Sequence, residues 1–115
     1  MVTSNTFPYL QVQFRVRGVQ MADWAYIDTG FDGFLIVQRT VASTLGNPDL
    51  VSTWELGDGS LTQGADYLGD IEITGVSVTI RGQVTCLGDE WILGLGMLNH
   101  FEATFDHGRS VRIRA

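Results

Sequence analysis

The sequence predicts an all-β domain that carries one or two short helices. Glycine is abundant, with 14 residues against two prolines, and it recurs at short intervals between apolar stretches. This spacing is typical of many short strands joined by tight turns. Apolar and polar residues also alternate in several segments, which is the period of a half-buried strand. Only two stretches, residues 38–45 and 94–101, suit a short helix.

The N-terminal part of the chain predicts three strands. Residues 9–17 alternate in polarity and place four apolar side chains on one face, namely Leu10, Val12, Phe14 and Val16. After a turn, a second strand at residues 21–27 ends at Asp28. Apolar residues resume at 34–37, which predicts a third, buried strand.

The rest of the chain predicts a helix, a hairpin and further short strands. Residues 38–45 predict one short helix, which stops at Gly46. Strand-like segments at 51–56 and from Leu61 onwards flank a turn of glycine and aspartate at 57–60, and this pattern predicts a β-hairpin. Further strands are predicted at residues 70–74, 76–80, 84–87, 91–93, 102–105 and 110–113, the last two forming a closing hairpin.

Composition excludes several classes of protein. A hydrophobic fraction of 44% with 17% charged residues fits a compact chain, and we expect one domain over residues 1–115. The net charge of −6, without any lysine, argues against binding to nucleic acid, because phosphates require a basic surface. No apolar run approaches the ~20 residues that span a bilayer, and the N-terminus lacks a signal-peptide pattern. We therefore expect a soluble, cytoplasmic protein without nucleic-acid or membrane partners.

Cysteine, histidine and metal chemistry are also limited. Cys86 is the only cysteine, so neither an intramolecular disulfide nor a thiolate metal cluster can form, and we expect a small buried side chain. His100 and His107 are the only histidines, and neither stands in a nucleophile motif. The spacing of the carboxylates resembles no known metal-ligand pattern. We expect no metal and no cofactor.

Asp28 is the strongest candidate for a functional residue. The apolar segment 25–27 delivers its carboxylate to a turn, and apolar residues resume at 34–37. A carboxylate at the end of a buried strand is costly unless it is paired or hydrogen-bonded, and such groups cluster at functional sites. Thr29 can lock the turn through its hydroxyl, and Gly30 allows a close backbone approach. Asp-Thr-Gly alone is also a common turn composition, which leaves a turn or cap role open.

Residues 25–30, Ala-Tyr-Ile-Asp-Thr-Gly, resemble the active-site loop of the retropepsin-like aspartic proteases. Residues 91–94, Trp-Ile-Leu-Gly, resemble the apolar strand and glycine that cross behind this loop, ahead of a short helix. The turn at 57–60 falls where the family has its flap. With Phe31 the motif continues as Asp-Thr-Gly-Phe, which resembles the motif of a prokaryotic branch of the family. The resemblance covers residues 9–113 and implies a closed β-barrel of the acid-protease type.

The resemblance implies a role for each residue of the motif. Asp28 would be the catalytic aspartate, Thr29 would hydrogen-bond across a dimer beneath the catalytic pair, and Gly30 would line the substrate backbone. The residues expected to bind substrate are Phe31, Asp32, Gly57, Asp58, Gly59 and Ile92. Two simpler interpretations stay open, namely Asp32 as a solvated loop acid and residues 57–59 as an ordinary hairpin turn.

The sequence departs from the family pattern at two positions. Phe31 stands where many relatives have a small residue, so we expect a narrowed or reshaped substrate pocket beside it. Leu95 follows Gly94 where retroviral members have an arginine that braces the acidic residue near the site. Asp32 therefore lacks that partner, and the retroviral arrangement of the dimer does not transfer directly to this chain.

Hydrolysis of an amide by carboxylates needs two of them, one as general base on water and one as general acid. Two like charges about 3 Å apart cannot both ionise, so the pair holds one proton. The chain has a single Asp-Thr-Gly, so a second Asp28 must come from another copy across a two-fold axis. We therefore expect a homodimeric aspartic endopeptidase that cleaves peptides or proteins with an acidic optimum.

Two other functions remain open. A peptide-binding or assembly module would keep the cleft and the flap but cleave poorly, because Phe31 fills the groove or the subunits pair through another surface. A hydrolase with the same carboxylate pair could also act on a non-peptide substrate. The Asp28, Thr29 and Gly30 triplet favours an enzyme over the binding module, whereas Phe31 and Leu95 depart from the enzyme pattern.

Overall fold

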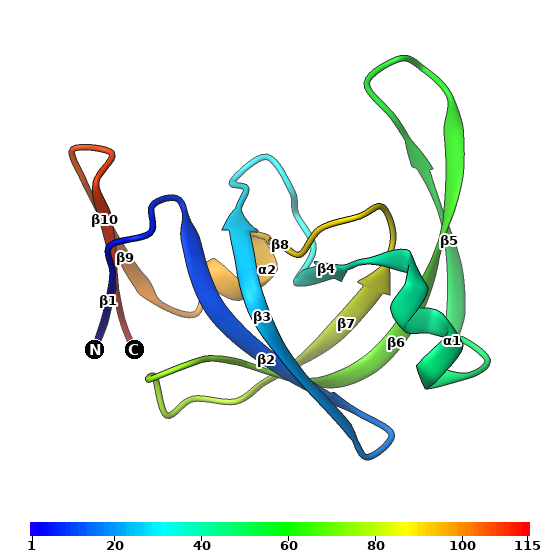
Figure 1. Cartoon of the computed structure of the whole chain (residues 1–115), viewed down its shortest axis with the longest axis horizontal. Helices are drawn as coiled ribbons and strands as arrows, with labels where there is room; N and C mark the ends of the chain where they lie inside the picture. Colours follow the sequence, from blue (N-terminus) through cyan, green and yellow to red (C-terminus); the bar gives the residue numbers. More distant parts are fainter.

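Six strands form a closed barrel in the computed structural model, which describes residues 1–115 (Figure 1). Hydrogen bonding runs in the order β2-β3-β8-β4-β7-β6, and β6 pairs again with β2 to close the ring. The strands of the barrel are β2 (Tyr9–Val16), β3 (Val19–Ile27), β4 (Leu35–Val37), β6 (Leu61–Ile73), β7 (Ile80–Cys86) and β8 (Ile92–Leu93). The predicted all-β barrel is therefore confirmed.

A hairpin and a second sheet extend the barrel. β5 (Leu50–Glu55) pairs with the first half of β6, and the resulting hairpin, green in Figure 1, projects beyond the barrel. β1 (Val2–Ser4) pairs with β10 (Ser110–Arg114), which pairs with β9 (Glu102–Asp106), so both chain ends lie side by side. The helical segments are short: η1 (Arg39–Val41), α1 (Ala42–Leu45) and α2 (Leu95–Leu98). None of them is long and apolar enough to cross a membrane.

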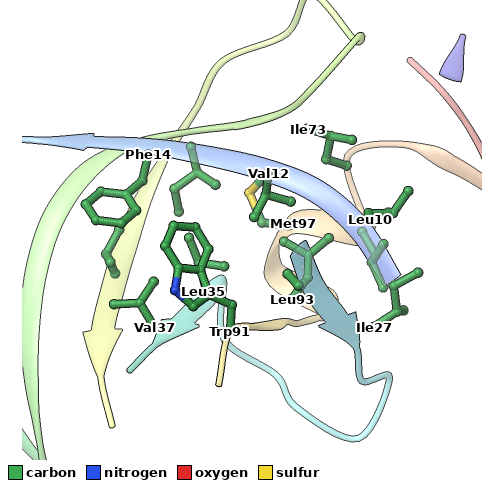
Figure 2. Packing of buried hydrophobic residues seen from close by; sticks show 14 of the residues in the cluster. Leu10, Val12, Phe14, Ile27, Leu35, Val37, Ile73, Trp91, Leu93 and Met97 are labelled. Atoms are coloured by element: carbon green, nitrogen blue, oxygen red, sulfur yellow. The ribbon is translucent and has the colours of Figure 1, made fainter. Parts of the chain in front are cut away.

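Alternation along β2 fills the inside of the barrel. Its inward side chains, Leu10, Val12, Phe14 and Val16, are each almost fully buried, as predicted. Trp91 packs beside Phe14, with the two ring centroids 5.4 Å apart, and both belong to the cluster in Figure 2. Burial of such apolar surface is the main favourable contribution to folding. β3, which pairs with β2 and leads to Asp28, adds Ala25 and Ile27 to the same core.

Cys86 is buried, as expected from the sequence. Burial in the barrel raises the pKa of its thiol to about 11, with a smaller contribution from the nearby Asp66 carboxylate. A thiol with this pKa stays protonated at neutral pH and is a poor nucleophile. His100 and His107 are both exposed.

The strand predicted at residues 76–80 is wrong. The chain turns after β6, and of this segment only Ile80 belongs to a strand. Val76 donates its N–H to the Ile73 carbonyl at 3.0 Å and buries its side chain in the core. The apolar alternation there comes from a turn that folds back on itself and not from an extended segment.

The two strands predicted from Leu61 onwards and at residues 70–74 are one continuous strand, β6. A Cβ at Gly69 would lie 2.6 Å from the Arg15 carbonyl oxygen and 2.5 Å from Val16 Cγ2, so only glycine lets β2 approach β6 this closely. The predicted helix at 38–45 begins as the 3₁₀ segment η1 and continues as α1. β1 was not predicted, because its three residues carry no pattern of their own.

Candidate active site

Asp28 follows the last residue of β3, and β8 holds it there. β3 and β8 run parallel, with Tyr26 opposite Ile92 and Ile27 opposite Leu93. Asp28 extends this arrangement, because its N–H donates to the Leu93 carbonyl at 3.0 Å. The two segments that carry the sequence resemblance are thus hydrogen-bonded neighbours. The side chain of Asp28 is half-buried, whereas Ile27 points into the core.

Backbone hydrogen bonds clamp the loop after Asp28 to the start of α2. The N–H groups of Leu95 and Gly96 donate to loop carbonyls at 2.8 and 2.9 Å. Within the loop, the Gly30 N–H donates to Asp28 Oδ1 at 2.8 Å. This bond fixes the direction of the carboxylate and leaves Oδ2 available to water or to a second group.

Thr29 and Asp32 lie exposed on the same loop. Neither side chain has a hydrogen-bond or ion-pair partner within the chain, and Leu95 offers no charge to Asp32. The expected bond of Thr29 across a dimer and the expected contact of Asp32 with substrate stay predictions. The setting of Asp32 also fits the simpler interpretation of a solvated loop acid.

The side chain of Phe31 packs against the backbone of the loop. Its ring covers two glycines: a Cβ at Gly33 would lie 2.4 Å from Phe31 Cζ, and a Cβ at Gly94 would lie 2.4 Å from Phe31 Cδ2. The ring centroid is also 5.6 Å from that of Trp54 on β5. Phe31 therefore connects the candidate active-site loop to the stem of the hairpin.

The hairpin of β5 and β6 ends in a tight turn at residues 56–60. Gly59 adopts a φ of 84°, which favours glycine. Asp58 Oδ1 accepts hydrogen bonds from the Ser60 hydroxyl at 2.6 Å and from the Ser60 N–H at 2.9 Å. These bonds, the hydroxyl first, hold the pKa of the Asp58 carboxyl below its usual 3.8. Asp58 thus stabilises its own turn, and contact of residues 57–59 with substrate stays a prediction.

Ile92 belongs to a row of side chains that crosses the outer face of the barrel. We call it the cross-strand row, and pairing places its members opposite one another in the order Tyr26, Ile92, Ile36, Thr85, Asp66 and Leu50. Paired residues point to the same face of a sheet. Because the row starts two residues before Asp28 and ends on β5, it forms a floor between the candidate site and the hairpin.

Sequence patterns did not identify four of the residues around the site. Ile36, Thr85 and Asp66 become neighbours only through strand register, which a single sequence does not state. Trp54 reaches Phe31 only because β5 folds back over the barrel. No local signal in the sequence marks any of them.

A closed barrel whose Asp-Thr-Gly loop is backed by an apolar strand and a short helix has the retropepsin-like fold. A solved structure with this fold is the retropepsin-like aspartic protease from Rickettsia conorii. The match has a TM-score of 0.65 at 16% sequence identity, and it covers 97% of this chain and 88% of that chain. No protein-family model matches the sequence. No curated protein matches it either.

One chain supplies a single Asp-Thr-Gly carboxylate. Asp28 Oδ1 is held by the backbone, and the neighbouring Thr29 and Gly30 are exposed, so the loop is open to a second molecule. No group of three or more His, Cys, Asp or Glu side chains is arranged to hold a metal ion. The loop therefore presents a carboxylate whose direction is fixed by the backbone.

Proposed function

We propose that the protein is a homodimeric aspartic endopeptidase to which each subunit contributes Asp28. The observation that carries the proposal is the placement of Asp28 at the end of β3, with one oxygen held by Gly30 and its loop clamped to α2. The retropepsin-like fold supports the same function, because the solved neighbour is an aspartic protease. At 16% identity that likeness extends to the fold alone, so the loop residues bear the rest of the argument.

The active pair requires a partner subunit. A two-fold axis between two such loops brings identical carboxylates together. Thr29 supports this arrangement, because its exposed hydroxyl has no partner within the chain and would donate a hydrogen bond across the interface. The partner thereby completes both the catalytic pair and the bonding of the loop.

In the dimer one Asp28 is ionised and the other is protonated, because two charges about 3 Å apart repel strongly. The ionised carboxylate takes a proton from water as the water oxygen bonds to the peptide carbonyl carbon. The protonated carboxyl gives its proton to the carbonyl oxygen, which yields a gem-diol. The C–N bond then breaks as one carboxyl protonates the nitrogen and the other carboxylate takes a hydroxyl proton, which restores the starting pair.

This mechanism predicts an acidic, bell-shaped pH profile, since activity requires the singly protonated pair. The substrate is an extended peptide that lies between the loop and the hairpin as an added strand. The residues proposed to contact it are Gly30, Phe31, Asp32, Ile92 and the hairpin tip at 57–59. No metal or organic cofactor takes part in the proposed steps.

The test compares wild type and Asp28→Asn on a diverse peptide library between acidic and neutral pH, with products identified by mass spectrometry. Asparagine keeps the bond from Gly30 but cannot take the proton from water, so cleavage should fall about 10³-fold or more. Asp23→Asn is the matched control, because the Asp23 carboxylate on the same strand accepts only the neighbouring Trp24 N–H. We expect this control to cleave like wild type.

Cleavage that survives in Asp28→Asn would overturn the mechanism. Peptide binding by wild type without cleavage at any pH would identify a binding module in its place. Sedimentation provides an independent check, because a strict monomer at high concentration leaves Asp28 without its partner and contradicts the homodimer.

A further inference from the structure

Asp66 is the one charged residue that the fold buries, with 4% of its surface exposed. Its Oδ1 accepts a hydrogen bond from Thr85 Oγ1 at 2.6 Å, and Thr85 is also 4% exposed. None of the ion pairs in the structure includes Asp66. Burial of a carboxylate without a cation costs several kcal/mol, so folding alone does not account for this residue.

The second oxygen of Asp66 is free. Thr85 is the only side chain that donates to the carboxylate. Every side-chain nitrogen or oxygen that is sealed from solvent has a hydrogen-bond partner, so the unpartnered Oδ2 must be reached from outside. The result is a fixed acceptor that is poorly hydrated, because the rest of the side chain is enclosed.

Asp66 also lines a groove of about 690 Å³ on the outside of the barrel. The other two acids of this groove already have cations: Asp49 pairs with Arg17 at 2.9 Å, and Asp70 pairs with Arg81 at 3.1 Å. Asp66 is therefore the acid of the groove that pairs with no cation. The third arginine of the groove, Arg15, pairs with no acid and donates to Gln20 Oε1 at 3.1 Å. A ligand with a positive charge would pair with Asp66.

The cross-strand row connects this groove to the candidate active site. Four strand spacings separate Tyr26, beside Asp28, from Asp66, which is roughly 19 Å along the sheet at about 4.8 Å per spacing. An extended peptide advances about 3.3 Å per residue, so it covers this path in about six residues. Leu50, the last member of the row, lines the groove as well, so the row and the groove form one path.

We propose that Asp66 selects an arginine or lysine side chain about six residues from the scissile bond of a peptide substrate. The assignment rests on the proposed function, because it names the substrate class of the same site. The cationic group donates a hydrogen bond to Oδ2 while Thr85 keeps its bond to Oδ1. Such a charge-assisted bond is stronger in a partly enclosed site than at an open surface. Asp66 acts far from the reacting bond, so its effect is on specificity.

The cation site is testable without proteolysis. In ¹H–¹⁵N NMR spectra, the amides of Asp66 and Thr85 are followed while agmatine, a small dication with one guanidinium and one ammonium group, is added. We expect a saturable shift of these amides, absent with the neutral analogue butylurea and absent in Asp66→Asn. Asparagine retains an oxygen for the Thr85 hydroxyl, so the variant should fold. Equal shifts with agmatine and butylurea, or none with either, would overturn the assignment.

The consequence for cleavage is measured with peptide pairs that differ only in arginine or citrulline, placed at each position in turn. Wild type should prefer arginine at one position by about tenfold, the effect of one hydrogen bond to a charged group. The preference should vanish in Asp66→Asn and persist in Asp23→Asn. Cleavage by wild type without any such preference refutes the role of Asp66 and leaves the protease intact. Agmatine binding without cleavage of any peptide refutes the protease and leaves the cation site intact.

Discussion

The candidate active-site loop and the tip of the hairpin are both rich in glycine, but glycine acts differently in the two. In the loop, Gly33 and Gly94 make room for the ring of Phe31 and for neighbouring backbone. At the tip, a Cβ added to Gly57 or Gly59 would meet nothing within 4 Å. The loop is thus a packed structure that fixes a carboxylate, and the tip is a self-contained turn with open space around it. Each of the following measurements tests this difference.

Gly94→Ala should have the largest effect. The new Cβ would lie 2.3 Å from the Gly33 carbonyl oxygen and 2.7 Å from the Phe31 carbonyl oxygen. These backbone atoms can move away only if the hydrogen bonds between the loop and α2 break. We expect the free energy of unfolding to fall by about 3 kcal/mol or more, measured by urea denaturation with circular dichroism. An unchanged denaturation midpoint would show that the loop is not packed in this way.

The contact between Phe31 and Trp54 should couple the loop to the hairpin stem. In a double-mutant cycle of Phe31→Leu and Trp54→Leu, we expect a coupling energy of about 1 kcal/mol, typical of a packed aromatic pair. Urea unfolding of wild type, the two single variants and the double variant gives this value. If the two single variants lower the free energy of unfolding additively, the stem and the loop are independent.

Asp58 should make the tip sensitive to acid. Its folded pKa is lowered by the bonds from Ser60, so the turn favours the ionised form. The stabilisation is therefore present above the usual value of 3.8 and is lost as pH falls through the lower folded pKa. Hydrogen exchange at the Ser60 N–H, corrected for intrinsic rates, should lose protection in this acid range. The Asp58→Ala variant should lack that protection at every pH, and equal protection in both proteins would contradict the role of Asp58.

Gly57→Ala should have the smallest effect. The position has open space and no left-handed φ, so the free energy of unfolding should change by no more than about 0.5 kcal/mol. The same urea measurement serves as the matched control for Gly94→Ala. A large decrease in the free energy of unfolding of Gly57→Ala would show that the tip is packed as tightly as the loop.

Local patterns were sufficient to predict much of the fold. Strict alternation located β2, and the apolar runs around Asp-Thr-Gly located Asp28 at the end of a strand. The pattern misled at residues 76–80, where a folded-back turn also buries an alternate residue. β1 could not be predicted, because its strand conformation depends on pairing with β10 at the other end of the chain.

The surroundings of Asp28 were predicted less well, because they depend on register. Asp66 and Thr85 lie on different strands, 19 residues apart, and nothing in their spacing announces a hydrogen bond between them. A carboxylate on the outer face of a strand normally lies in water. The burial of Asp66 follows only from the assembled sheet around it.

The parallel pairing of β3 with β8 has a consequence for the order of folding. Leu93, which accepts the bond from the Asp28 N–H, lies 65 residues later in the chain (93 − 28). Contacts between such distant residues form slowly, because the entropy of loop closure opposes them. During synthesis Asp-Thr-Gly emerges long before the strand that seats it, so a nascent N-terminal fragment carries the motif without a positioned carboxylate. The proposed activity is thereby withheld until the barrel is nearly complete.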